Sequence, residues 1–77
     1  MMPAKKTTTL ALIGCGLWGR NILRDLIDLD CRVIVVDPDL TQRAKAESLG
    51  AIQTLERIDS LPDVDGLVVA APATTHY

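Results

Sequence analysis

The chain has 77 residues, of which 48% are hydrophobic, so it has the length of one small domain and enough apolar side chains for a packed core. Its formal net charge of −2 excludes a strongly basic protein of the kind that binds nucleic acid or acidic membranes. No segment approaches the roughly 20 apolar residues of a membrane span. Residues 1–6 are predicted to be a flexible leader without the features of a secretory signal, so a cytoplasmic location is expected. Cys15 and Cys31 do not have the spacing of metal ligands, and no metal site is predicted.

The first half of the chain predicts a strand, a helix and a second strand. Residues 7–13 are β-branched and apolar and run into a glycine cluster, which indicates a buried strand followed by a tight turn. A helix is expected over about 18–29, because apolar residues recur there at helical spacing. Those residues are Ile22, Leu23, Leu26, Ile27 and Leu29. The aliphatic run at 31–36 predicts the second strand, which Asp37-Pro38 ends.

The second half predicts a second helix and two further strands. Asp39 stands three residues before Gln42, a match to a helix capping box with Asp in place of Ser or Thr. Gly50 suits the residue that follows the helix. A modest apolar stripe is expected along this helix, formed by Leu40, Ala44 and Leu49. The remaining elements are a strand at 51–54, one or two helical turns at 55–61, a turn at 63–66 and a strand at 67–71.

Strands and helices that alternate in this way predict an α/β fold with parallel strands and right-handed crossovers. The expected architecture is a Rossmann-type, doubly wound sheet of about four strands in the order 3-2-1-4, an incomplete version of the larger fold. Residues 7–77 would then be part of a dinucleotide-binding domain. Ligands of such sheets bind at the carboxyl ends of the strands, where the strand order reverses.

The glycine turn at 14–19 (GCGLWG) lies at that edge of the predicted sheet. Gly14 permits the sharp bend after the strand, Gly16 lets the backbone approach a pyrophosphate, and Gly19 allows the helix to pack closely on the sheet. The start of the helix offers unpaired N–H groups and a positive dipole end to an anion. The strand before the turn and the helix after it supply the context that this fingerprint requires. The alternative is a turn with a purely structural role.

Asp37 is the predicted selector of the cofactor. A carboxylate at the end of the second strand can accept hydrogen bonds from the adenosine ribose hydroxyls and would repel a 2′-phosphate, which favours NAD over NADP. The alternative is that Asp37 merely ends the strand before Pro38. Arg43 is of a type that can meet a 2′-phosphate, but on the helix beyond the capping box it is expected to face water.

Three segments together resemble one family, the Gfo/Idh/MocA oxidoreductases, named after glucose–fructose oxidoreductase and inositol dehydrogenase. They are GCGLWGRN at 14–21, VVDPD at 35–39 and DVDGLVVAAPATTHY at 63–77. The last is the most specific, since members of that family carry a similar Asp-Val-Asp segment followed by Ala-Pro and His. The resemblance covers the chain from Leu10 onward, but only the first half of that family's cofactor domain.

The resemblance implies NAD(P)-dependent oxidation of a secondary alcohol on a sugar or sugar-like substrate. It places Ala71 and Pro72 on the nicotinamide side of the pocket, with His76 nearby, and Leu17 and Trp18 at the phosphate turn. A local helix cap is the alternative for His76, and shielding of the helix base is the alternative for Trp18. The family's Glu-Lys-Pro motif, its later catalytic His and its substrate domain are not in this sequence. The chain alone is therefore expected to bind the cofactor without catalysing the reaction, and no catalytic residue is predicted.

Two other interpretations stay open. The glycine turn and VVDPDLTQR echo the stand-alone nucleotide-sensing modules that gate potassium channels, although those modules lack the Ala-Pro…His loop. The other is a vestigial fold without a ligand. The fourth strand would leave an open sheet edge in this chain, so self-association through that edge is also predicted.

Overall fold

In the computed structural model, residues 7–14 and 16–70 are described, with the side chains of Leu17 and Trp18 outside the description. Four strands form one parallel sheet in the order β3-β2-β1-β4. The strands are β1 (Thr9–Ile13), β2 (Arg32–Val36), β3 (Gln53–Leu55) and β4 (Gly66–Val69). The predicted Rossmann-type α/β architecture and its strand order are thus confirmed.

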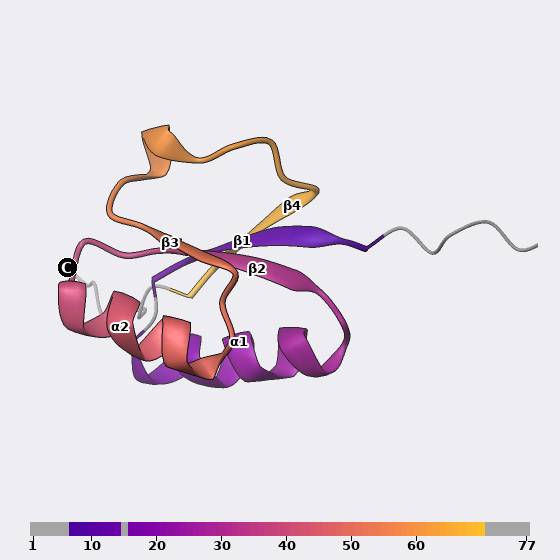
Figure 1. The fold of residues 1–77 in the computed structure, drawn as a ribbon, viewed down its shortest axis with the longest axis horizontal. Helices are drawn as coiled ribbons and strands as arrows, with labels where there is room; N and C mark the ends of the chain where they lie inside the picture. Colours follow the sequence, from indigo (N-terminus) through magenta and orange to yellow (C-terminus); the bar gives the residue numbers. More distant parts are fainter. Residues whose placement is uncertain (1–6, 15, 71–77) are drawn as a thin grey trace, which may run out of the picture.

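Both α-helices cover the same face of this sheet (Figure 1). Helix α1 (Leu17–Asp28) joins β1 to β2, and α2 (Leu40–Leu49) joins β2 to β3. The segment between β3 and β4 crosses the opposite face and contains the short 3-10 helix η1 (Ile58–Ser60). The predicted boundaries differ from these by one or two residues at most ends, and the helical turns expected at 55–61 shrink to η1.

The core lies between the sheet and the helices. The fully buried side chains there come from the inner strands and from both helices, and Ala70 completes the group at 8% exposure. They are Leu12, Leu23, Val33, Val35 and Ala46. The cluster explains why β1 and β2 read as aliphatic runs, since these two central strands are covered on both faces.

The apolar stripe predicted for α1 is confirmed except at its end. Leu23 is fully buried, and Ile22, Leu26 and Ile27 pack against the core. Leu29 is 72% exposed, because α1 ends at Asp28 and Leu29 follows it as the cap.

The stripe predicted for α2 is wrong. Leu40 is 71% exposed and Ala44 is also exposed, whereas the one buried side chain of this helix is Ala46. Leu40 and Leu49 stand at the two ends of the helix, so its middle meets the core through a small side chain.

Gly50 ends α2 in the left-handed conformation, as predicted, with φ of 114°. An added Cβ would lie 3.0 Å from Ile27 Cδ1, so alanine there is both strained and crowded. We expect Gly50→Ala to lower the free energy of unfolding by about 1–2 kcal/mol. Urea denaturation followed by circular dichroism measures this change. The control is Asp30→Gly, because Asp30 also has a positive φ, of 64°, and glycine should leave stability unchanged or raise it. Equal destabilisation by both substitutions would contradict this explanation.

Asp65 connects the start of β4 to the start of β1 by two hydrogen bonds to Thr9. Its N–H donates to the Thr9 carbonyl oxygen at 2.7 Å, and its Oδ2 accepts from the Thr9 N–H at 2.8 Å. These bonds lie at the edge of the sheet where the parallel strands begin, away from the glycine turn.

On the described residues, β4 pairs with β1 alone, and two of its side chains are exposed on the face that the helices do not cover. They are Leu67, at 56% exposure, and Val69, at 68%. Self-association through this edge stays a prediction.

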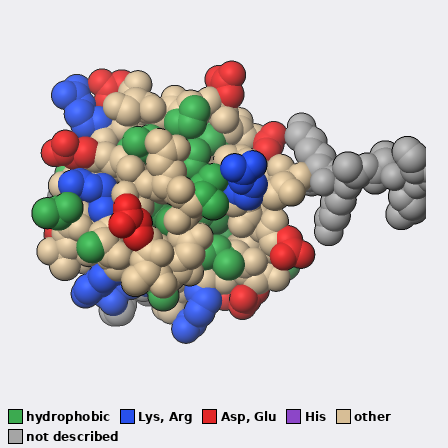
Figure 2. All heavy atoms as spheres, viewed as in Figure 1, with side chains coloured by type: hydrophobic (Ala, Val, Ile, Leu, Met, Phe, Trp, Pro, Cys, Tyr) green, Lys and Arg blue, Asp and Glu red, His purple; other side chains and the backbone are tan. Residues whose placement is uncertain are grey.

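Positive and negative side chains are interspersed on the side of the molecule that Figure 2 shows, so that side carries no patch of a single sign. Within the described ranges, no helix is long and apolar enough to cross a membrane.

Candidate functional site

The turn between β1 and α1 is tied to the neighbouring strand. Gly14 has φ of 90°, a conformation that glycine adopts without steric cost. Its N–H donates to the carbonyl oxygen of Val36, the last residue of β2, at 2.8 Å. The bend after β1 therefore lies directly beside the end of β2.

Gly19 is required by packing of the protein itself. A Cβ at this position would lie 2.6 Å from the Gly14 carbonyl oxygen and 3.2 Å from its carbonyl carbon. Both atoms belong to the backbone, which cannot move aside as the end of a flexible side chain can. The close approach of α1 to the turn confirms the packing task predicted for the third glycine.

Gly16 differs from Gly19, because neither its backbone nor its described neighbours require glycine. Its φ of −73° and ψ of −157° are open to any residue, and an added Cβ would meet nothing within 4 Å. As far as the described residues go, the space in front of Gly16 is therefore open. A glycine at such a place leaves room for a ligand to approach the backbone.

The N-terminus of α1 opens onto this same space. Gly16 is its N-cap, no side chain caps the helix, and the first turn holds no acidic residue. The first N–H groups of a helix carry a partial positive charge that favours an anion. The turn thus combines an open backbone surface with a helix end suited to a phosphate.

Asp37 lies directly after β2, as predicted, and is 8% exposed. Its N–H donates to the Leu55 carbonyl oxygen at 2.9 Å. Its Oδ1 accepts a hydrogen bond from the Asp39 N–H at 2.8 Å, which fixes the orientation of the carboxylate. An ionised carboxylate offers about four acceptor positions in total, and the Asp39 N–H occupies one of them.

The capping box predicted at the start of α2 is half right. Asp39 caps the helix, and its Oδ1 accepts from the Thr41 N–H at 2.8 Å. The reciprocal bond, in which Gln42 Oε1 would accept from the Asp39 N–H, is absent because that N–H donates to Asp37 Oδ1. Gln42 Oε1 is instead buried without a hydrogen-bond partner among the described residues.

Arg43 does not face water as predicted. Its Nη1 donates to the backbone carbonyl oxygen of Asp37 at 2.8 Å, and the side chain is only partly exposed. The guanidinium therefore lies at the end of β2, beside the residue predicted to select the cofactor. The position of Arg43 indicated that such a contact was possible, because an arginine one turn into a helix can reach back past the helix start. The sequence alone does not identify which acceptor it binds.

The carboxyl ends of β1, β2 and β4 lie side by side in the sheet. Gly14 follows β1, Asp37 follows β2, and Ala70 follows β4, where its N–H donates to the Ile13 carbonyl oxygen at 2.9 Å. Ala70 Cβ also lies 3.6 Å from the position that a Cβ on Gly19 would occupy. Other predicted site positions fall outside the described residues: Ala71, Pro72 and His76, together with the side chains of Leu17 and Trp18.

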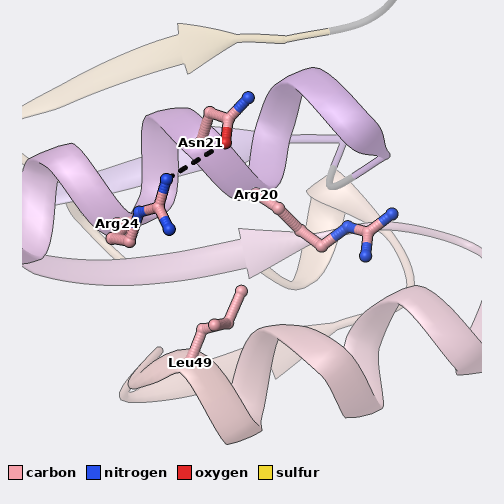
Figure 3. A pocket seen from close by; sticks show the side chains of 4 residues that line it. All are labelled: Arg20, Asn21, Arg24 and Leu49. Carbon is pink, nitrogen blue, oxygen red and sulfur yellow. Dashed lines mark hydrogen bonds between the residues drawn. The ribbon is translucent and has the colours of Figure 1, made fainter.

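A small hollow of about 240 Å³ lies between α1 and α2. It is lined by Arg20, Asn21 and Arg24 of α1 and by Leu49 of α2 (Figure 3). Arg24 Nη2 donates to Asn21 Oδ1 at 3.4 Å, while Arg20 extends the other way, toward the N-terminal end of α1. Arg20 Nε is buried without a hydrogen-bond partner among the described residues. No sequence pattern indicates this hollow.

A comparison with known families decides which kind of domain this is. The family model described as "D-isomer specific 2-hydroxyacid dehydrogenase, NAD binding domain" matches residues 2–77. The chain belongs to this family. It is therefore a Rossmann-type NAD-binding domain of an NAD-dependent dehydrogenase, and the predicted cofactor, NAD, is confirmed at the level of the family. No curated protein matches the chain.

The family match does not support the resemblance from which a sugar-type substrate was expected. It shows a 2-hydroxyacid dehydrogenase NAD-binding domain, and it does not show the Gfo/Idh/MocA family. The glycine turn, the acid after the second strand and the strand order are features of Rossmann-type dinucleotide-binding domains in general, so they could not separate the two families. The segment that seemed most specific, 63–77, lies partly outside the described residues.

The described residues fit NAD and offer no metal site. Gly16 leaves the backbone accessible, and a buried carboxylate stands at the end of the neighbouring strand. Over residues 7–14 and 16–70, no group of three or more His, Cys, Asp or Glu side chains is placed to hold a metal ion. The chemistry that this NAD-binding domain brings is that of the dinucleotide, which accepts or donates a hydride when bound.

Proposed function

We propose that this NAD-binding domain holds the pyrophosphate of NAD at the turn of Gly14, Gly16 and Gly19. The observation that carries the proposal is the open space at Gly16, where nothing in the described protein accounts for a glycine. A pyrophosphate in that space would receive hydrogen bonds from the first N–H groups of α1. Gly14 and Gly19 support the site by shaping the bend and letting α1 pack against it.

Asp37 is proposed to bind the adenosine ribose. Its carboxylate is oriented by the Asp39 N–H and stands at the end of β2, the strand next to the glycine turn. Carboxylate oxygens accept hydrogen bonds from ribose hydroxyls and repel a 2′-phosphate, so the site should prefer NAD to NADP. Leu17 and Trp18 remain proposed contacts at the phosphate turn. Ala71 and Pro72 remain proposed on the nicotinamide side of the pocket, with His76 nearby.

The proposed substrate of the enzyme that carries this domain is a 2-hydroxy acid. The name of the matching family supports this class. The sugar-type alcohol has only the three quoted segments in its favour, and the family match does not favour a stand-alone sensing module. An assay of the polypeptide in which this domain occurs in the cell, with D-2-hydroxy acids and sugar alcohols and NADH absorbance as readout, separates the two substrates. Turnover of sugar alcohols alone would overturn the proposed substrate.

The proposed role of Asp37 predicts a loss of affinity when its charge is removed. We expect the chain to bind NADH about tenfold or more tightly than NADPH, and Asp37→Asn to weaken NADH binding by about tenfold. Asparagine keeps an oxygen that can accept from the Asp39 N–H, so the local turn should persist. Titration calorimetry measures both affinities, and thermal melting checks the fold.

Asp65→Asn is the matched control. Asp65 also accepts a backbone hydrogen bond through its carboxylate, but it lies at the opposite edge of the sheet. NADH affinity should therefore stay at the wild-type value in this variant. Wild-type binding of NADPH as tight as that of NADH would refute the role given to Asp37.

A further inference from the structure

The hollow between α1 and α2 is lined by two arginines from the same side of one helix. Arg20 and Arg24 are four residues apart on α1, so their side chains leave the helix as neighbours. In Figure 3 the Arg24 guanidinium lies at one end of the hollow and the Arg20 side chain at the other, with Leu49 of α2 across from them. A pair of positive charges therefore borders one space of about 240 Å³.

No carboxylate in the described part of the chain neutralises these two charges, because neither arginine forms an ion pair there. The nearest acids along α1 are Asp25 and Asp28, which are both exposed and pair with neither arginine. On the α2 side, the Glu47 carboxylate accepts a hydrogen bond from β3 instead. The positive charge at the hollow is thus uncompensated by the described protein.

The position of Arg20 on its helix adds to this charge. Arg20 is the fourth residue of α1, and the first turn holds no acidic residue. A cation there adds to the positive end of the helix dipole, and like charges four residues apart repel each other. Arg20 Nε is also buried without a hydrogen-bond partner among the described residues. An anion in the hollow would offset the repulsion, and it would bring acceptors to a place where donors are unused.

The size and lining of the hollow indicate what kind of anion fits. The Arg24 guanidinium has five N–H donors, and its bond to Asn21 Oδ1 is long, at 3.4 Å. Two of its N–H groups can donate to two oxygens of one phosphate group. Leu49 supplies an apolar wall. A space of about 240 Å³ suits a phosphate group with a few carbon atoms and is too small for a dinucleotide.

We propose that the hollow between α1 and α2 is a second anion-binding site, which takes a phosphate group that is free or carried by a small metabolite. Arg24 donates to the phosphate oxygens, and Arg20 supplies the second positive charge. The site is separate from the glycine turn, because Arg24 comes eight residues after Gly16. A helix rises about 1.5 Å per residue, which puts the two places about 12 Å apart along α1. The inference does not depend on the proposed NAD site, and both sites can be filled together.

The test is a nuclear magnetic resonance titration of the full chain labelled with nitrogen-15. The ligands are inorganic phosphate and glycerol 3-phosphate, with chloride at the same ionic strength as the reference. The signals are the backbone amides of α1 and the Nε–Hε groups of the arginines. The variants are Arg24→Gln and Arg24→Lys, and the matched control is Arg32→Gln. Arg32 is exposed at the start of β2, so its replacement removes the same charge elsewhere.

We expect saturable shifts at the amides of residues 20–24 and at the Nε–Hε groups of Arg20 and Arg24, with a dissociation constant of about 1 mM or below. Arg24→Gln should weaken binding about tenfold, because the charge and the planar fork are both lost. Arg24→Lys should weaken it less, since it keeps the charge. Arg32→Gln should stay within about twofold of the wild type, because exposed charges that are far apart are screened by salt.

The two ligands identify the source of the phosphate group. Tighter binding of glycerol 3-phosphate supports a small phosphorylated metabolite as the natural ligand, and equal binding supports free phosphate. Thermal melting with and without phosphate checks that each variant folds. If Arg24→Gln does not fold, the Nε–Hε shifts of the wild type and the affinity of Arg24→Lys decide the question.

Three results would overturn the proposal. One is the absence of a saturable shift at residues 20–24 up to about 20 mM phosphate. Another is equal weakening by Arg24→Gln and Arg32→Gln, which would indicate an effect of net charge alone. The third is a set of shifts confined to Gly16 and Gly19 and abolished by saturating NADH. That pattern would place phosphate at the glycine turn only, so the proposed NAD site would stand while this inference failed.

Discussion

Replacing Gly19 by alanine is expected to lower the free energy of unfolding by about 3 kcal/mol, because the new methyl group enters space held by backbone. Its Cβ would lie 2.6 Å from the Gly14 carbonyl oxygen, so either α1 or the turn after β1 must shift. Small domains have total stabilities near the low end of about 5–15 kcal/mol, so the substitution would remove a large part of the free energy of unfolding. Urea denaturation followed by circular dichroism measures the change.

Gly16→Ala is the control that separates folding from binding. No atom of a described neighbour lies within 4 Å of its added Cβ, and its φ of −73° suits alanine. The loss of stability should stay below about 1 kcal/mol, the cost of alanine at a helix N-cap. Affinity for NADH should nevertheless fall by about tenfold or more, because the methyl group occupies the space proposed for the pyrophosphate. A Gly16→Ala protein that binds NADH as the wild type does would contradict the proposed site.

Leu23→Ala is the second substitution with a large expected effect. Leu23 is fully buried in the cluster between α1 and the sheet. Truncating a buried leucine costs about 2–5 kcal/mol, from lost apolar burial and from the cavity that remains. The shift of the urea midpoint, with an unchanged slope of the transition, reports this loss.

Leu29→Ala gives the matched comparison, because the same atoms are removed at a residue that is 72% exposed. Its effect should stay within about 0.5 kcal/mol. NADH at about 100 times its dissociation constant should restore about 2.7 kcal/mol to Leu23→Ala, since the ligand binds the folded chain alone. Failure of excess NADH to raise the melting temperature would show that the core variant no longer forms the site.

Much of the fold could be predicted because its determinants are local. The runs that became β1 and β2 are aliphatic because both faces of these strands are covered, and α1 shows a clear apolar stripe. The predicted apolar stripe of α2 was wrong, because this helix contacts the core through Ala46 while Leu40 and Leu49 lie at its ends. A small residue gives a weak periodic signal even when it marks the place of closest packing.

In the candidate site too, some features could be predicted from the sequence and others could not. The positions of Gly14, Gly19 and Asp37 follow from the order of strand, turn and helix along the chain. The partners of Asp39 and Arg43 do not, because several acceptors compete for each donor. The Asp37 carboxylate accepts the hydrogen bond from the Asp39 N–H that Gln42 was expected to accept. Only the three-dimensional path of the chain decides which of these two side chains is the acceptor.

The hydrogen bonds of Asp37 to Asp39 and Arg43 also link cofactor binding to the stability of α2, a helix with no predicted cofactor contact of its own. Asp37 joins the end of β2 to the start of α2 through the Asp39 N–H and the Arg43 guanidinium. Opening of the first turn of α2 must therefore release the Asp37 carboxylate, the group proposed to bind the ribose. A ligand that holds this carboxylate makes such opening rarer, so amide protons at the start of α2 should exchange more slowly with solvent as NAD occupancy rises.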